Sequence, residues 1–148
     1  LGGERAQKWG LGLDDYVATA NDELMLMPMI EHADAVAAID DILSIPGLDF
    51  LFVGPGDLTA SLGHVGEWDT PATAEAIAHV LARAKAHGVT AGIYAHGPAE
   101  VKARTGQGFR IIAIGSDLPM MITRISSDLA AIADGAEGGV ALAQGGAG

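Results

Sequence analysis

The sequence predicts a parallel α/β fold built from about four successive strand–helix units. Short, continuous apolar runs recur along the chain, as in parallel strands that are buried on both faces. Each run is followed by a segment whose apolar residues recur at helical spacing. Four such units make half of an eight-stranded TIM barrel, which typically has about 250 residues. On spacing alone, a complete four-stranded doubly wound sheet is an alternative.

Composition narrows the class of protein further. The chain of 148 residues is 49% hydrophobic, has a net charge of -11 and contains no cysteine. The lack of cysteine excludes disulfides, thiolate zinc sites and cysteine nucleophiles, and the acidity argues against nucleic-acid binding. No apolar run has the roughly 18 residues of a membrane helix, and the first residues lack a signal-peptide pattern. We therefore expect a cytoplasmic protein without a membrane partner, and a segment of a longer gene product because residue 1 is Leu.

The predicted strands are the four apolar runs. The first extends from Leu24 to Ile30 and ends at Glu31, and Pro28 is expected to end or bulge it. The other three strands are predicted at Phe50–Val53, Val89–Tyr94 and Phe109–Ile114. Residues 54–57, after the second strand, are expected to form a tight loop.

Helices are predicted between and after the strands, over residues 33–43, 70–87, 98–105 and 118–133. Thr70 is the expected N-cap of the second of these, with Pro71 at its first position and Gly88 just past its end. In the last helix, four apolar residues are expected to face inward: Met121, Ile122, Ile125 and Leu129. The Gly- and Ala-rich residues 135–148 are expected to form a flexible tail, which leaves residues 1–134 as the domain.

Two carboxylates occupy the positions where parallel α/β folds carry their chemistry. Glu31 and Asp57 follow consecutive predicted strands, and consecutive parallel strands are usually neighbours. Their carboxylates can therefore converge on one cation, and hard oxygen ligands suit Mg²⁺ or Mn²⁺. The alternative is that each acid only stabilises the N-terminus of the helix that follows it.

The residues around these acids resemble the HpcH/HpaI aldolase family, the class II pyruvate-dependent aldolases related to the citrate lyase β-subunit. The resemblance covers about residues 2–133. Three stretches carry it: Pro28-Met29-Ile30-Glu31, Gly54-Pro55-Gly56-Asp57-Leu58-Thr59-Ala60-Ser61-Leu62-Gly63, and Ala113-Ile114-Gly115-Ser116-Asp117. The opening residues 3–10 also look like the loop that follows the fourth strand of the family's barrel, so the chain would be the C-terminal half.

The resemblance implies a metal site and a substrate site. Glu31 and Asp57 would be the two protein ligands of a divalent metal, Mg²⁺ or Mn²⁺ with Co²⁺ as a further candidate. The backbone N–H groups of Gly56 and Asp57 would bind the carboxylate of pyruvate at the start of a helix. One departure is Met29, which stands where the family often has Gln near pyruvate.

The implied activity is aldol cleavage or formation of 4-hydroxy-2-oxo or 2-oxo-3-deoxy acids, giving pyruvate and an aldehyde through a metal-stabilised enolate. The general base and an Arg would come from the missing half of the barrel, or the chain would work in a homo-oligomer. A Schiff-base route is disfavoured because no lysine follows a strand. The alternatives are a citryl- or malyl-CoA lyase-like enzyme and an inactive truncated half-barrel.

The remaining polar candidates are assigned by position. His79 and His87 are expected on helix surfaces and His32 near the first turn after Glu31. His64 and His96 lie in loops that could line a substrate pocket. Three more residues have mainly structural interpretations: Arg5 as a solvated charge, and Trp9 and Tyr16 as packing or interface residues. Ser116 and Asp117 could shape the pocket or cap a helix.

Overall fold

The computed structural model describes residues 5, 12–67 and 70–134. It has four strands, β1 (Met29–Ile30), β2 (Phe50–Val53), β3 (Thr90–Ala95) and β4 (Ile111–Ile114). The helices are α1 (Leu13–Thr19), α2 (Ala33–Ala37), α3 (Ile39–Leu43), α4 (Pro55–Ser61), α5 (Pro71–Ala86), α6 (Pro98–Gln107) and α7 (Asp117–Asp134). The predicted tail over residues 135–148, and the opening residues 3–10 apart from Arg5, lie outside the described part of the chain.

The four strands form one parallel sheet in the order β1-β2-β3-β4. The register pairs Ile30 with Val53, Val53 with Ile93, and Ile93 with Ile112. Each strand therefore lies next to its successor, so the chain winds in one direction, as in a barrel. A doubly wound sheet reverses its strand order at a switch point, and no reversal occurs here. The predicted succession of four strand–helix units is confirmed.

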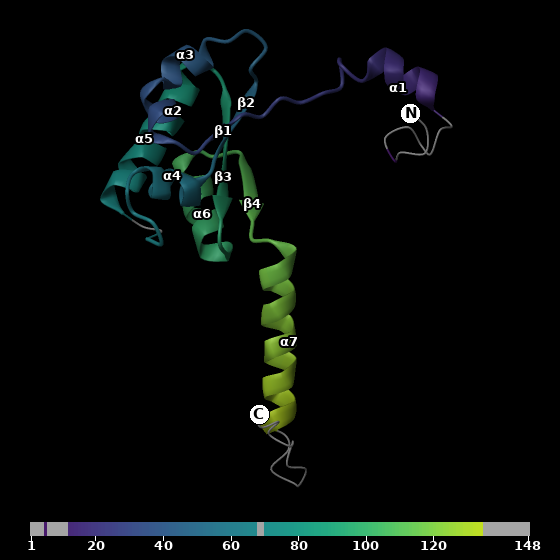
Figure 1. The fold of residues 1–148 in the computed structure, drawn as a ribbon, viewed down its shortest axis with the longest axis vertical. Coiled ribbons are helices and arrows are strands. Elements are labelled where there is room, and N and C mark those ends of the chain that lie inside the picture. The colour runs from purple at the N-terminus through teal and green to yellow at the C-terminus, as the bar shows by residue number, and fades with distance from the viewer. Residues whose placement is uncertain (1–4, 6–11, 68–69, 135–148) are drawn as a thin grey trace, which may run out of the picture.

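The core lies between this sheet and the helices that cover one of its faces. Helices α2 to α6 lie on that face (Figure 1). Strands and helices both contribute core residues that are less than 2% exposed. These are Ile30, Leu51, Val53 and Ile93 from the strands, and Ile39, Leu58 and Val80 from α3, α4 and α5. This packing fixes the positions of the loops that leave the carboxyl ends of the strands.

Strand β1 is much shorter than the predicted strand Leu24–Ile30. Among the described residues it pairs only with β2, where the Pro28 carbonyl accepts a 2.9 Å hydrogen bond from the Phe52 N–H. Residues 24–27 precede that pairing and have exposed side chains. An apolar run forms a strand only where a neighbour supplies a hydrogen-bonding ladder, and Pro28 itself has no N–H to donate.

Two other predicted segments differ in detail. The single helix predicted over residues 33–43 is divided into α2 and α3 at Ala38, whose backbone leaves the helical region (φ -95°, ψ 17°). The tight loop predicted over residues 54–57 is instead the start of α4, with Gly54 as N-cap and Pro55 as first residue. Proline is favoured at that first position because its fixed φ suits a helix and its missing N–H is not needed.

Helix α5 begins and ends as its sequence predicts. The Thr70 hydroxyl accepts a 3.1 Å hydrogen bond from the Thr73 N–H, and Pro71 is the first helical residue. Gly88 follows the C-cap with φ +74°, a conformation that residues with a Cβ rarely adopt. Local signals were sufficient here because each cap is made within the helix itself.

The prediction that the apolar residues of α7 face inward is wrong for the described structure. The helix forms, but it extends away from the sheet (Figure 1). The four predicted core residues are half or more exposed: Met121 55%, Ile122 54%, Ile125 50% and Leu129 61%. Helical periodicity identifies a face that favours burial, but the described residues supply no surface that covers it. None of the described helices is long and apolar enough to span a membrane.

Candidate functional site

The first candidate residue, Glu31, immediately follows β1 at the carboxyl end of the sheet. Its side chain is half-buried and lies over the backbone of Gly54. A Cβ atom at Gly54 would be 3.2 Å from both the Cβ and the Oε2 atoms of Glu31. The Gly54 N–H also donates to the Ile30 carbonyl at 3.1 Å. Close backbone pairing and the missing Cβ together place the Glu31 carboxylate against the segment that leads into α4.

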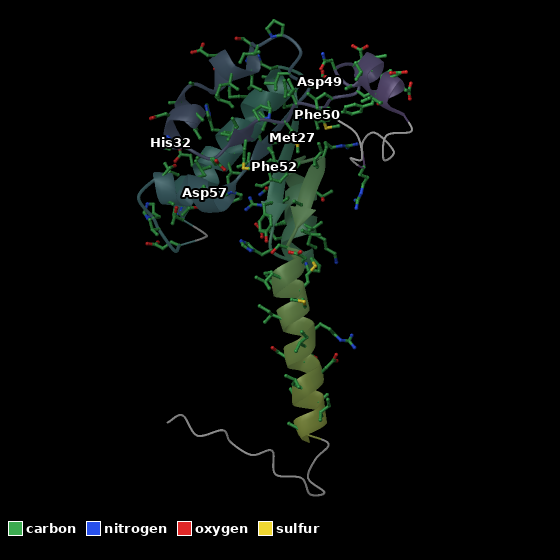
Figure 2. The ribbon with its side chains drawn as sticks, turned by 45° about the vertical axis from the view of Figure 1, so that its right-hand side comes forward. Met27, His32, Asp49, Phe50, Phe52 and Asp57 are labelled. Carbon is green, nitrogen blue, oxygen red and sulfur yellow. The ribbon has the colours of Figure 1, made fainter. Side chains whose placement is uncertain are left out.

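The second candidate, Asp57, is the third residue of α4 and is exposed. Helix α4 begins two residues after the end of β2, so Asp57 is at the same carboxyl edge as Glu31. In Figure 2, Asp57 lies on the side of Phe52, whereas Asp49 and Phe50 lie toward the other end of β2. The two acids thus leave adjacent, hydrogen-bonded strands, as the strand order requires.

The alternative assignment of Glu31 as a helix cap does not hold. The N-cap of α2 is His32, whose Nδ1 accepts a 3.2 Å hydrogen bond from the Asp34 N–H. Asp57 is in the first turn of α4, where an acid favourably meets the helix dipole. Among the described residues, the carboxylates of Glu31 and Asp57 form no ion pair and no side-chain hydrogen bond. Both therefore keep their oxygen lone pairs available.

This donor set fits a hard divalent cation. Two carboxylates provide oxygen ligands, and Mg²⁺ is commonly held by one or two carboxylates with water or substrate completing its coordination. The part of the chain that the structure describes has no cluster of three or more His, Cys, Asp or Glu that could hold a metal. Any further ligands would therefore come from water, from substrate or from residues beyond those described.

The first turn of α4 also presents backbone donors at this edge. Gly56 and Asp57 are its second and third residues, ahead of the Leu58 N–H, which donates to the Gly54 carbonyl at 3.0 Å. The first N–H groups of a helix have no partner within the helix. Gly56 is half-buried and has no side chain to cover its N–H. These N–H groups can donate hydrogen bonds to a small carboxylate next to Glu31 and Asp57.

A serine that sequence reasoning did not single out connects the two segments. The Ser61 hydroxyl accepts a 3.1 Å hydrogen bond from the Ala33 N–H, two residues after Glu31, and donates to the Leu58 carbonyl at 2.8 Å. Its sequence signal is its place in the stretch of residues 54–63 that resembles the family, one helical turn after Asp57. The contact depends on how α2 and α4 pack, so that signal alone was not enough to find it.

A buried chain of threonine hydroxyls holds the other side of α4. Thr59 donates to the Pro55 carbonyl at 2.6 Å and accepts from the Thr73 hydroxyl at 3.1 Å. The Thr73 and Thr70 hydroxyls are 2.8 Å apart. All three threonines are at most 6% exposed. Buried and fully paired hydroxyls fix a local geometry, and this chain ends on the turn that carries Gly56 and Asp57.

The other histidines divide between structural and site-edge positions. His79 is exposed on α5, as expected for a helix surface. His87 ends α5 and lies 3.1 Å from Asp40 Oδ1, which also accepts a 2.6 Å hydrogen bond from Arg83. His64 follows α4, with its Nδ1 atom 3.8 Å from a Glu67 carboxylate oxygen. A pocket role for His64 stays a prediction.

A hollow of about 520 Å³ lies at the carboxyl ends of β3 and β4, and His96 is among the residues that line it. The His96 ring contacts the Tyr94 ring edge-on at 5.0 Å between centroids. The His96 N–H donates to Glu100 at 2.9 Å. Burial raises the pKa of Glu100, but this bond and the Arg104 guanidinium outweigh it and keep the pKa below its usual value. Glu100 thus holds the loop that carries His96 at the same edge as Glu31.

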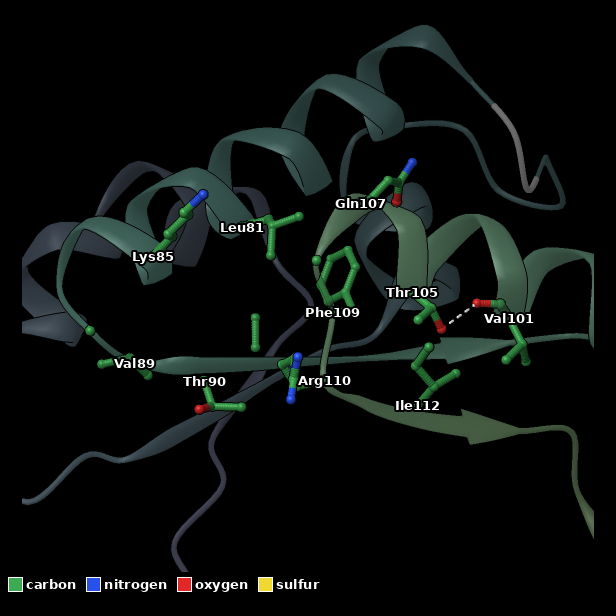
Figure 3. A pocket seen from close by; sticks show the side chains of 13 residues that line it. Leu81, Lys85, Val89, Thr90, Val101, Thr105, Gln107, Phe109, Arg110 and Ile112 are labelled. Atoms are coloured by element: carbon green, nitrogen blue, oxygen red, sulfur yellow. Dashed lines mark hydrogen bonds between the residues drawn. The ribbon is translucent and has the colours of Figure 1, made fainter.

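Another hollow, of about 750 Å³, lies between α5 and α6 (Figure 3). It is larger, but it is at the opposite edge of the sheet, where β3 and β4 begin. Its lining includes Phe109, Arg110 and Lys85, and it contains no carboxylate. It is therefore separate from Glu31 and Asp57 and does not serve the chemistry that they could carry.

The remaining predicted positions are less informative. Lys85 and Lys102 are in α5 and α6 and do not follow the carboxyl end of a strand, and Arg5 is exposed. Tyr16 is 40% exposed on α1, so the described residues do not bury it, and its interpretation as an interface residue stays a prediction. Asp117 begins α7 and accepts a 2.8 Å hydrogen bond from the Leu118 N–H, which favours the helix-start interpretation. Lys8 and Trp9 lie outside the described residues.

Comparison with known proteins identifies the relatives of this chain. A sequence model of the HpcH/HpaI aldolase/citrate lyase family matches residues 2–123. The hydroxypyruvate/pyruvate aldolase of Roseovarius nubinhibens is 36% identical over 80% of this chain and 46% of its own length. The 5-keto-4-deoxy-D-glucarate aldolase of Citrobacter koseri is 40% identical over 77% of this chain and 44% of its own.

A solved structure agrees with these sequence relatives. The HpcH/HpaI aldolase/citrate lyase family protein of Burkholderia cenocepacia superposes with a TM-score of 0.78 and 36% identity, over 89% of this chain and 51% of that one. The chain spans about half the length of the relatives that it matches, in agreement with four units of a larger barrel. From its sequence match and its fold, the chain belongs to the HpcH/HpaI aldolase/citrate lyase family.

Proposed function

We propose that the barrel containing this chain is a divalent-metal-dependent aldolase that forms or cleaves 4-hydroxy-2-oxo or 2-oxo-3-deoxy acids, with pyruvate as one product. The observation that carries the proposal is the placement of Glu31 beside the Gly54 backbone at the start of the helix that bears Asp57. The relatives named hydroxypyruvate/pyruvate aldolase and 5-keto-4-deoxy-D-glucarate aldolase support this substrate class.

In this proposal each residue has a defined task. Glu31 and Asp57 hold Mg²⁺ or Mn²⁺, with Co²⁺ as a further candidate. The bound cation supplies electrostatic stabilisation of the charge that develops on the ketone oxygen when the carbon–carbon bond breaks. The N–H groups of Gly56 and Asp57 bind and orient the carboxylate of the 2-oxo acid. The proton-transfer group is assigned to the part of the barrel beyond this chain.

We further propose that the chain acts in an assembly, either as a homo-oligomer or with a complementary barrel half. Helix α7 exposes apolar side chains along its length, including Leu118, Met121, Ile125 and Ile132. Large exposed apolar surfaces mark association sites in proteins that remain in solution. The edge strands β1 and β4 also offer unpaired backbone to a neighbour among the described elements.

The metal site is tested by calorimetric titration of Mn²⁺ into the wild type and into Glu31→Gln and Asp57→Asn. Both changes keep side-chain size while removing charge, so binding should be lost in each. Glu67→Gln is a matched control, because Glu67 is an exposed acid near His64 and beyond α4. Wild-type affinity in Glu31→Gln or Asp57→Asn would remove that residue from the site.

The reaction is tested by pyruvate release from 4-hydroxy-2-oxo acids, on this chain together with its complementary barrel half, with and without EDTA. We expect activity that EDTA abolishes and Mn²⁺ or Mg²⁺ restores. Activity that persists in EDTA would contradict the metal-dependent route. A CoA thioester assayed in parallel tests the citryl- or malyl-CoA lyase alternative. Metal binding without turnover of either substrate class would favour the inactive half-barrel.

A further inference from the structure

We propose that Ser61 is a positioning residue that fixes Glu31 relative to Asp57. Its hydroxyl is held between two segments that each carry one of the carboxylates. It donates to the Leu58 carbonyl at 2.8 Å within α4, and it accepts the Ala33 N–H at 3.1 Å from the start of α2. The inference rests on the proposed function, because the distance that it fixes matters when both acids share a cation.

The geometry of the hydroxyl explains why it can perform this task. The bond to Leu58 directs the hydroxyl proton into α4, which leaves the oxygen lone pairs facing α2. The Ala33 N–H is one of the first N–H groups of α2, which have no partner within a helix. His32 satisfies the Asp34 N–H, and Ser61 satisfies the Ala33 N–H. The turn after Glu31 is thus held by one hydrogen bond within α2, from His32, and by one from α4, through Ser61.

The opposite side of α4 is held independently, so Ser61 acts on a fixed support. Thr59 is buried and bonds to Pro55 within α4 and to Thr73 on α5. The helix therefore cannot easily shift to compensate for a lost Ser61 contact. Removal of the hydroxyl should release the segment that carries Glu31 and leave α4, with Asp57, in place.

Two substitutions break this contact from opposite sides. Ser61→Ala removes the acceptor, and Ala33→Pro removes the donor and places the proline Cδ where the Ser61 hydroxyl now accepts, so this variant breaks the contact from the α2 side. Proline suits the first position of a helix, and His32 already has the extended backbone (φ -133°, ψ 145°) that a residue before proline prefers. Ser61→Thr retains the hydroxyl and serves as the rescue variant. Ser44→Ala is the matched control, because the Ser44 hydroxyl makes the same type of bond, to the Asp41 carbonyl, and no hydrogen bond to another of the described elements.

The measurements are Mn²⁺ affinity and hydrogen exchange of the Ala33 amide, both on the full chain. A neutral hydrogen bond contributes modestly, so we expect Ser61→Ala and Ala33→Pro to weaken Mn²⁺ binding about fivefold. Ser61→Thr and Ser44→Ala should bind like the wild type. The Ala33 amide should exchange faster in Ser61→Ala than in Ser44→Ala, at equal free energies of unfolding.

The outcomes separate this inference from the proposed function. Wild-type Mn²⁺ affinity in both Ser61→Ala and Ala33→Pro would overturn the positioning role. If the wild type itself binds no Mn²⁺, the metal proposal fails, and amide exchange alone decides whether Ser61 holds the segment. Unchanged exchange of Ala33 in Ser61→Ala would then overturn the inference.

Discussion

Substitution of Gly54 by alanine tests the placement of Glu31 more directly than removal of the acid itself. The new Cβ would lie 3.2 Å from the Cβ and Oε2 atoms of Glu31 and 3.4 Å from the Met29 sulfur. The backbone at Gly54 has a negative φ of -98°, so alanine is not excluded by a left-handed conformation. The effect of the substitution should therefore arise mainly at the carboxylate.

The size of that effect follows from the distances. Comfortable contacts between carbon atoms are about 3.5–4.0 Å, so the Glu31 side chain must move by a few tenths of an ångström. Metal–ligand distances tolerate only about 0.2 Å. We expect the carboxylate to lose its optimal position and Mn²⁺ affinity to fall about tenfold, which corresponds to about 1.4 kcal/mol.

Gly97→Ala is the matched control for this experiment. Gly97 is also an N-cap followed by proline, it also has a negative φ (-172°), and no atom lies within 4 Å of its hypothetical Cβ. Both substitutions replace an N-cap glycine by alanine, at a similar cost of about 0.5 kcal/mol in unfolding free energy. Mn²⁺ titration and urea unfolding of the two variants separate metal affinity from stability. Equal Mn²⁺ affinity in Gly54→Ala and Gly97→Ala would refute the reasoning.

Three further outcomes are expected. Gly92→Ala in β3 would place a Cβ 2.7 Å from a phenylalanine ring on β2. The free energy of unfolding measured in urea should therefore fall by about 1–3 kcal/mol. An unchanged free energy of unfolding would contradict this expectation and show that the sheet relaxes. The hydrogen bond from Arg83 lowers the pKa of Asp40, so this carboxylate stabilises the fold at neutral pH and loses its effect as the pH falls below about 4. The difference in melting temperature between wild type and Asp40→Asn should therefore become smaller in acid. A difference that stays constant with pH would contradict this stabilising role of Asp40. The double variant Ile122→Lys/Ile125→Lys should self-associate less than the wild type, as measured by sedimentation. A wild type that is itself a stable monomer would argue against an interface on α7.

The sequence predicted those parts of the fold that are decided locally. Strand β2 has its predicted bounds because its apolar run is continuous and buried, and α5 has its predicted caps because Thr70 and Gly88 act within the helix. Strand β1 and the packing of α7 depend on partners that distant residues must provide. A periodic pattern states which face favours burial, and it does not state what covers that face.

The candidate site also contains residues that the sequence predicts locally and residues whose roles depend on distant packing partners. Strand order was enough to predict Glu31 and Asp57 at one edge of the sheet. Ser61 could not be assigned in the same way, because a hydroxyl on a short helix has several possible partners and packing selects among them. Only the arrangement of α2 against α4 identifies the Ala33 N–H as its donor.

The pairing of β1 with β2 explains why Gly54 is needed at this site. Ile30 is level with Val53, so Glu31 and Gly54 are the next residues along their strands and face one another. The Gly54 N–H bonds to the Ile30 carbonyl, which prevents the two segments from separating to admit a larger side chain. Asp57 then follows Gly54 by three residues, so it lies in the first turn of α4, at the same edge of the sheet. Register, a missing Cβ and helical pitch therefore bring the two acids to one region of the sheet, although they are 26 positions apart in the sequence.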